Sequence, residues 1–152
     1  MIVVLNNIRS LYNVGSIFRT ADAAGIEKIY LCGITPEPVD KLGKLRPQMI
    51  KVSLGAEKTV AWDGSARSPR ATLKLLEKLK KEGYKIFAVE QAKNSIPYYK
   101  VALRPAQDKI VLVFGNEVNG IPRTILKKCD KVLEIPMKGK KESLNVSVAF
   151  GI

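Results

Sequence analysis

The sequence contains no histidine and only two cysteines, Cys32 and Cys129, in 152 residues. The absence of histidine excludes catalysis by Ser-His-Asp or Cys-His arrangements. Two cysteines form neither a disulfide framework nor a zinc site, and we expect no metal. No stretch approaches the roughly 18 unbroken apolar residues of a membrane span, and the N-terminus lacks the pattern of a signal peptide. We therefore expect a cytoplasmic protein of one domain that does not associate with membranes.

Basic residues outnumber acidic ones by 26 to 14, which gives a net charge of +12. A surface of this kind attracts polyanions at long range. The basic residues are concentrated in two stretches, 41–51 and 127–141. A lysine-rich surface of the type found in thermophilic proteins is the alternative interpretation. Because the charge is clustered, nucleic acid is the favoured partner, and binding should weaken steeply with salt.

Short apolar runs rich in valine and isoleucine predict five buried strands, at residues 2–5, 28–32, 85–89, 110–114 and 132–135. Helical patterns lie between them, at residues 13–24, 68–83 and 122–128 and from residue 143 onward. Such alternation predicts an α/β domain whose parallel sheet is flanked by helices. The proline-containing stretch 33–63 is predicted to be a long loop with a short helix at 39–45.

Polar residues follow the first predicted strand at helical spacing. Asn13, Ser16 and Arg19 occur at i, i+3 and i+6, which forms a polar stripe beside the apolar face of the helix. One interpretation is a helix capped by Asn13 that carries a solvated arginine. The other is a binding site in which Arg19 holds a phosphate through two parallel hydrogen bonds.

Polar residues also follow two later strands. Gly115 and Glu117 come directly after residues 110–114, and ligands of open α/β sheets bind at the carboxyl ends of strands. The pair Asn119-Gly120 is also typical of a simple turn. After residues 132–135, a Pro-Met-Lys-Gly turn leads to Ser143 and Asn145, either of which can cap a helix. Neither a dinucleotide fingerprint nor a P-loop is present, which disfavours a nucleotide-binding metabolic enzyme.

Together, these segments resemble the three motifs of the SpoU-type (TrmH-like) RNA ribose 2′-O-methyltransferases of the SPOUT superfamily. The matching residues are Asn13-x-Gly15-x-x-x-Arg19-Thr20-Ala21, then Leu112-Val113-Phe114-Gly115-Asn116-Glu117-x-x-Gly120, then Ile135-Pro136-Met137-x-Gly139 with Ser143-Leu144-Asn145-Val146-Ser147-Val148-Ala149. The resemblance spans nearly the whole chain. It implies a parallel-sheet fold with a deep C-terminal trefoil knot, S-adenosylmethionine bound in that knot, and a homodimer with the active site near its interface.

The resemblance also implies roles for individual residues. The S-adenosylmethionine pocket would be lined by Gly115, Ile135 and Leu144, with Met137 and Leu112 as weaker candidates. The catalytic and RNA-binding set would be Asn13, Arg19, Glu117, Ser143 and Asn145. Members of the family usually end in a longer helix, whereas this sequence stops nine residues after Ser143. We therefore expect a single domain, residues 1–152, with a shortened C-terminal helix.

The implied reaction is attack of a ribose 2′-oxygen on the methyl donor, which requires RNA (tRNA or rRNA) because only RNA carries a 2′-hydroxyl. The guanidinium of Arg19 does not deprotonate, so we interpret it as an electrostatic clamp rather than a base. Glu117 either orients Arg19 or Asn145 or acts as the base. Tyr98 and Tyr99 either stack on bases or form a half-buried pair. The alternative function is a non-catalytic RNA-binding protein that keeps the fold.

Overall fold

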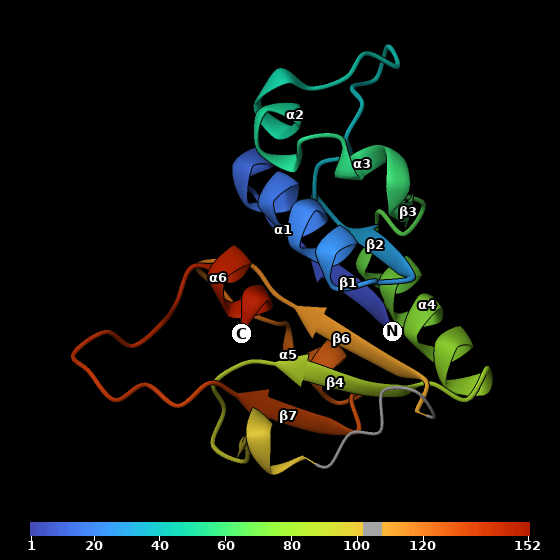
Figure 1. Ribbon diagram of the computed structural model, residues 1–152. Coiled ribbons are helices and arrows are strands. Elements are labelled where there is room, and N and C mark those ends of the chain that lie inside the picture. The colour runs from blue at the N-terminus through green and yellow to red at the C-terminus, as the bar shows by residue number, and fades with distance from the viewer. Residues whose placement is uncertain (102–107) are drawn as a thin grey trace.

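The computed structural model describes residues 1–101 and 108–152, which form one seven-stranded sheet flanked by helices (Figure 1). The strand order is β3-β2-β1-β6-β4-β7-β5, and every pairing is parallel. The strands are β1 (Ile2–Asn6), β2 (Lys28–Cys32), β3 (Ala61–Asp63), β4 (Lys85–Val89), β5 (Ile96–Pro97), β6 (Ile110–Phe114) and β7 (Lys131–Glu134). The helices are α1 (Leu11–Ala23), α2 (Pro47–Ser53), α3 (Ala56–Thr59), α4 (Pro69–Lys81), α5 (Arg123–Leu126) and α6 (Val146–Gly151), with a 3₁₀ turn η1 (Tyr98–Lys100).

The sheet is buried on both faces because successive side chains of each strand point to opposite sides. Val3 and Leu5 of β1 pack with α1 on one face, where α2, α3 and α6 also lie. Ile2 and Val4 pack with α4 and α5 on the other face. This two-sided burial explains why the central strands are continuous apolar runs rather than alternating ones. The predicted α/β parallel sheet is thereby confirmed.

The five predicted strands are confirmed to within about a residue. The predicted helix at 39–45 is wrong, because Val39 and Leu45 instead form an isolated antiparallel bridge closed by a turn at Gly43. The helix of this region starts later, at Pro47, where the fixed φ of proline suits the first helical turn. The two shortest strands, β3 and β5, were not predicted.

Two helix starts differ from the prediction, and both differences matter for the site. Helix α1 is capped by Ser10, whose hydroxyl accepts a hydrogen bond from the Asn13 backbone N–H at 3.2 Å. Asn13 therefore lies inside the first turn, and its side chain is released from capping. Helix α6 starts at Val146 and is capped by Asn145, not by Ser143. Within residues 1–101 and 108–152, no helix combines the length and apolar character that crossing a membrane requires.

Candidate active site

Three segments far apart in the sequence meet at the carboxyl ends of β1 and β6. Asn13 donates from Nδ2 to Oε1 of Glu117 at 3.0 Å, and its Oδ1 accepts from Nδ2 of Asn145 at 3.1 Å. The Oδ1 of Asn145 in turn accepts from the backbone N–H of Ser147 at 2.9 Å. We call Asn13, Glu117 and Asn145 the motif network. It joins the first turn of α1, the loop after β6 and the start of α6, so one residue from each sequence motif is held in a fixed orientation.

Glu117 is held by backbone groups as well as by Asn13. Its Oε2 accepts from the N–H of Arg9 at 3.2 Å, and its Oε1 is 3.5 Å from the N–H of Ser10. Partial burial raises the pKa of Glu117, but the hydrogen bonds from its own backbone N–H, Asn13, Arg9 and Ser10 outweigh this effect and lower the pKa below its ordinary value of 4.5. Glu117 is therefore ionised throughout the neutral range and suits a positioning role better than that of a base.

The lowered pKa predicts a specific pH dependence of stability for Glu117→Gln. Because folding lowers this pKa, the contribution of the carboxylate is fully present above pH 4.5 and is lost as the pH falls through the folded value. Denaturant unfolding should show the variant to be less stable than the parent at pH 7, with a difference that shrinks below pH 4.5. Glu142→Gln is the matched control, because Glu142 is exposed and accepts no hydrogen bond from a described residue. An unchanged difference at pH 3 would contradict this assignment.

Two adjoining hollows lie beside the motif network, between the ends of β4, β6 and β7 and the start of α6. Ile135, Met137 and Leu144 line the first. Gly115 lines the second, and Ser143 and Leu144 are common to both. Four of the five residues assigned to a cofactor wall are thus brought together. Leu112 is the exception: it lies in the middle of β6, pairs with Val3 and Phe87, and packs in the core, so the structure does not place it at this wall.

The loop after β6 is fixed by close backbone contacts. A Cβ on Gly115 would lie 2.6 Å from the backbone nitrogen of Ile121, so only glycine lets the two ends of the loop approach. Asn116 closes the loop by exchanging two backbone hydrogen bonds with Gly120, and its Nδ2 donates to the carbonyl of Asn7 at 2.7 Å. The loop therefore fixes the position of the second hollow relative to the motif network.

Glu90 is a residue of this site that the sequence analysis missed. It follows β4 directly, lines both hollows, and accepts from the N–H of Ile121 at 2.9 Å and from that of Gln91 at 3.0 Å. The rule that pointed to Glu117, a carboxylate just past the end of a buried strand, applies equally to Glu90.

The side chains of Arg19 and Ser143 have no hydrogen bond or ion pair to any residue within 1–101 and 108–152. Arg19 is exposed on α1, about 9 Å further along the helix axis than Asn13. Of the two orienting roles considered for Glu117, the structure shows contact toward Asn145 through Asn13 and none toward Arg19. Ser143 is exposed at the rim of both hollows, which leaves its hydroxyl available to a ligand.

The family model described as the SpoU rRNA Methylase family matches residues 1–152. The chain belongs to the SpoU family. It is 32% identical to the 23S rRNA (guanosine-2′-O-)-methyltransferase RlmB of Neisseria meningitidis, over all of this chain and 55% of that protein. It is 34% identical to the tRNA (guanosine(18)-2′-O)-methyltransferase of Aquifex aeolicus, over all of this chain and 65% of that protein. The AdoMet-bound rRNA methyltransferase of Sinorhizobium meliloti superposes with a TM-score of 0.84 and 28% identity, over 99% of this chain and 52% of that one.

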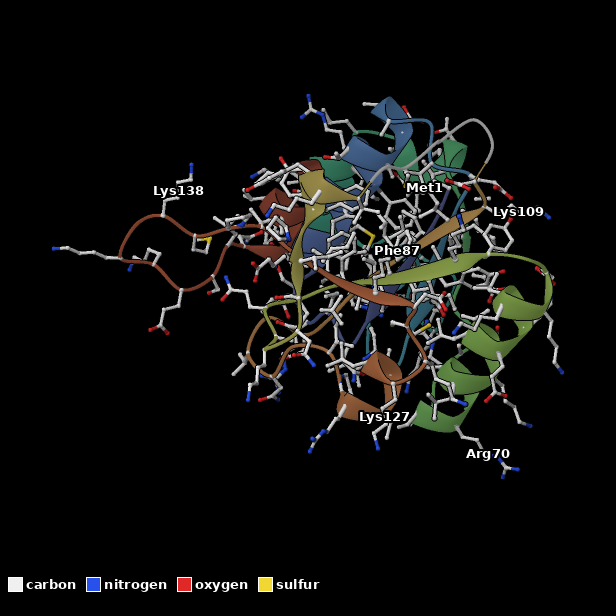
Figure 2. The ribbon with its side chains drawn as sticks, turned by 90° about the horizontal axis from the view of Figure 1, so that it is seen from below. Met1, Arg70, Phe87, Lys109, Lys127 and Lys138 are labelled. Carbon is white, nitrogen blue, oxygen red and sulfur yellow. The ribbon has the colours of Figure 1, made fainter. Side chains whose placement is uncertain are left out.

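This SpoU family chain spans about half the length of the curated relatives it matches. Its basic loop between β7 and α6, which carries Lys138, projects away from the sheet (Figure 2).

Tyr98 and Tyr99 form an edge-to-face pair with ring centroids 5.5 Å apart, and their exposed fractions are 39% and 64%. This exposure agrees better with the stacking interpretation than with a half-buried pair, and stacking on bases stays a prediction.

Proposed function

We propose that residues 1–152 form one SPOUT methyltransferase domain that transfers a methyl group from S-adenosylmethionine to a ribose 2′-hydroxyl of tRNA or rRNA. The observation that carries the proposal is the motif network, which lies against the two joined hollows at the strand ends. Relatives named as ribose 2′-O-methyltransferases of rRNA and of tRNA match the whole chain, which supports the reaction and leaves both RNA classes as substrates.

The hollows suit S-adenosylmethionine on chemical grounds. Apolar walls from Ile135, Met137 and Leu144 match a flat adenine ring, and the carboxylates of Glu90 and Glu142 match the positive charges of the sulfonium and ammonium groups. Gly115 brings backbone groups to the edge of the second hollow. When bound, S-adenosylmethionine supplies a methyl carbon on a positively charged sulfur. Transfer of the methyl group leaves this sulfur in a neutral thioether.

The chain's own residues then have to position a weakly acidic ribose hydroxyl. Ser143, at the rim of the hollows, would hydrogen-bond the ribose, and the side chain of Asn145 is held by its hydrogen bond to Asn13. Holding the attack geometry is worth up to roughly 7–11 kcal/mol. Glu117, ionised and bound by four donor groups, acts through Asn13 as a positioning residue.

Arg19 is the proposed clamp on the phosphate of the target nucleotide and on the developing alkoxide. It has no partner in the described residues of this chain, and we propose that a homodimer brings it to the site. In support, α6 packs along α1, and the apolar side chains of Tyr12, Val148 and Ile152 on these segments are each about half exposed. A patch of this kind is typical of an interface between subunits.

We also propose that the C-terminal segment forms the deep trefoil knot of the superfamily. After β7, the chain runs out through residues 135–145 and returns to α6 on α1 (Figure 1). Because β4 and β6 separate β7 from β1 in the sheet, this return crosses two strands. To form the knot, the segment would in addition pass through a loop formed by other parts of the chain, against the usual rule for folds.

The test is transfer of tritiated methyl groups from S-adenosylmethionine to in vitro transcribed tRNA and 23S rRNA, with mapping of the modified ribose. Binding of S-adenosylmethionine alone is measured in parallel by calorimetry. We expect both binding and 2′-O-methylation. Binding of RNA without transfer would support the alternative of a non-catalytic RNA-binding protein, and failure to bind S-adenosylmethionine would overturn the proposal.

A further inference from the structure

A further hollow, in addition to the two beside the motif network, lies on the other side of the loop after β6. Asn116 and Gly120 line the second of those two hollows, and they also line a depression formed by Asn7, Arg9 and Ile34. This depression continues into a more enclosed hollow at the carboxyl ends of β1 and β2, bounded by the starts of α4 and α5. We call it the strand-end hollow; its lining includes Asn6, Ile34, Arg67, Thr72, Pro122 and Thr124. It is distinct from the motif network and adjoins it through one loop.

Asn6, which lines this hollow, carries a buried side-chain amide nitrogen without a partner in the described part of the chain. It is the last residue of β1 and only 3% exposed, and its Nδ2 has no hydrogen-bond partner among the described residues. A buried amide without a partner is costly, and native interiors rarely keep one. The missing partner is an acceptor atom, which a ligand in the hollow can supply.

The hollow is rigid because its lining residues are tied to one another. Asn7 adopts a left-handed conformation with φ of 61°. Its backbone N–H donates to the carbonyl of Cys32 at 3.1 Å, and its Oδ1 accepts from the N–H of Ile34 at 3.1 Å. Strained residues that are locked by their surroundings are concentrated at ligand sites, where they preorganise the binding surface.

The lining selects the chemistry of the occupant. Ile34, Pro69 and Pro122 offer apolar surface, Thr124 offers a hydroxyl, and no acidic residue is among those that line the strand-end hollow or the depression beside it. The guanidinium of Arg9 lies at the depression, and that of Arg67 lies at the strand-end hollow, where it is ion-paired with Glu37. These features match a ligand with an uncharged ring that offers hydrogen-bond acceptors and is attached to a polyanionic chain.

We infer that the strand-end hollow holds an unpaired nucleobase of the RNA substrate next to the methylated ribose, with Asn6 donating to an acceptor on the base. The inference rests on the proposed function and adds to it a base-reading site. A nucleotide flipped into such a pocket is normally read by contacts with the faces and the hydrogen-bonding edge of its base. The 115–120 loop would then lie between the base and the methyl donor, and each side of the loop would contact one of them.

The direct test is NMR titration of the isotope-labelled chain with each of the four nucleoside 5′-monophosphates, with ribose 5-phosphate as the control ligand. We expect shifts of the Asn6 side-chain amide and of the Thr72 and Thr124 backbone amides with nucleotides but not with ribose 5-phosphate. A short single-stranded RNA should give the same shifts at concentrations at least about tenfold lower, because its phosphates add charge contacts. Equal affinities for the RNA and for the nucleoside monophosphates would assign the site to free nucleotides instead of RNA. Shifts with ribose 5-phosphate, or none with any ligand, would overturn the inference.

Two variants link the hollow to methylation. Thr124→Phe fills it from an exposed position, and Asn6→Leu removes the unpaired amide at similar volume. Each should lower kcat/KM for RNA by about tenfold, mainly through KM, since base contacts are worth this much. Binding of S-adenosylmethionine should not change. Ala24→Phe, at the exposed end of α1, is the matched control. Normal kinetics of folded Thr124→Phe would refute the base site while leaving the proposed function intact, whereas no transfer by the parent chain would refute the proposed function itself.

Discussion

Arg19→Ala is expected to lower methyl transfer to RNA by about 10²- to 10³-fold, the usual cost of removing a group that stabilises transition-state charge. The reason is that Arg19 is the one member of the predicted catalytic set that can supply a permanent positive charge. It lies exposed on α1, and no described residue forms a hydrogen bond or an ion pair with its side chain. Because Arg19 lines neither of the hollows assigned to S-adenosylmethionine, binding of the donor and folding should be unchanged. Single-turnover transfer with saturating RNA measures the effect on the chemical step.

Two further variants distinguish a specific clamp by Arg19 from a general effect of positive charge on the transfer rate. Arg19→Lys keeps the charge but loses the planar fork, so it should recover only part of the rate. Lys74→Ala removes a positive charge from an exposed position on α4, across the sheet from α1, and should leave the rate within a factor of about two if long-range charge contributes little. Near-normal transfer by Arg19→Ala would refute the clamp.

The position of Arg19 relative to the dimer can also be measured. If a partner subunit receives Arg19, mixing Arg19→Ala with Ser143→Ala at equal amounts should restore about a quarter of the parental activity, since half of the dimers are mixed and each has one intact site. If Arg19 acts within its own chain, mixing restores nothing, because every site then lacks one of the two side chains.

Much of this architecture follows from local sequence patterns. The central strands are continuous apolar runs because helices cover both faces of the sheet, and α4 is marked by Ser68 and Pro69 at its start. The errors fall where tertiary contacts decide. Residues 39–45 form a bridged loop instead of a helix. The strand β5 is only two residues long, and its place in the sheet depends on pairing with β7 rather than on its own sequence.

The site was predicted in part, for a similar reason. Residues just past the ends of buried strands, such as Glu117 and Gly115, could be found because parallel strands bring their carboxyl ends to one edge. The partnership of Asn13 with Asn145 could not be found, because it depends on α6 returning to α1 over a separation of 132 residues. For Leu112, which packs against the core, a motif match alone does not show whether a strand residue faces the pocket or the core. Asn6 gave no sequence signal beyond its place at a strand end.

Gly120→Ala is expected to cost both stability and cofactor binding. Gly120 has a φ of 63°, and a Cβ there would collide with the carboxylate of Glu90. The left-handed conformation alone costs an L-residue about 1–2 kcal/mol, and forcing an atom into a packed site typically adds about 1–3 kcal/mol. Displacing Glu90 would also break its hydrogen bond to Ile121 and remove a carboxylate from the hollow. Denaturant unfolding and calorimetry with S-adenosylmethionine measure the two effects.

Gly25→Ala separates the two causes, because Gly25 has nearly the same φ, 65°, and no atom within 4 Å of an added Cβ. This control should lose only the conformational term and should bind S-adenosylmethionine normally. The excess loss in Gly120→Ala then reports the contact with Glu90, and Glu90→Ala in the Gly120→Ala background should remove that excess while cofactor binding stays weak. Equal losses in the two glycine variants, with normal binding in both, would show that Glu90 and the 115–120 loop do not shape the pocket for the methyl donor.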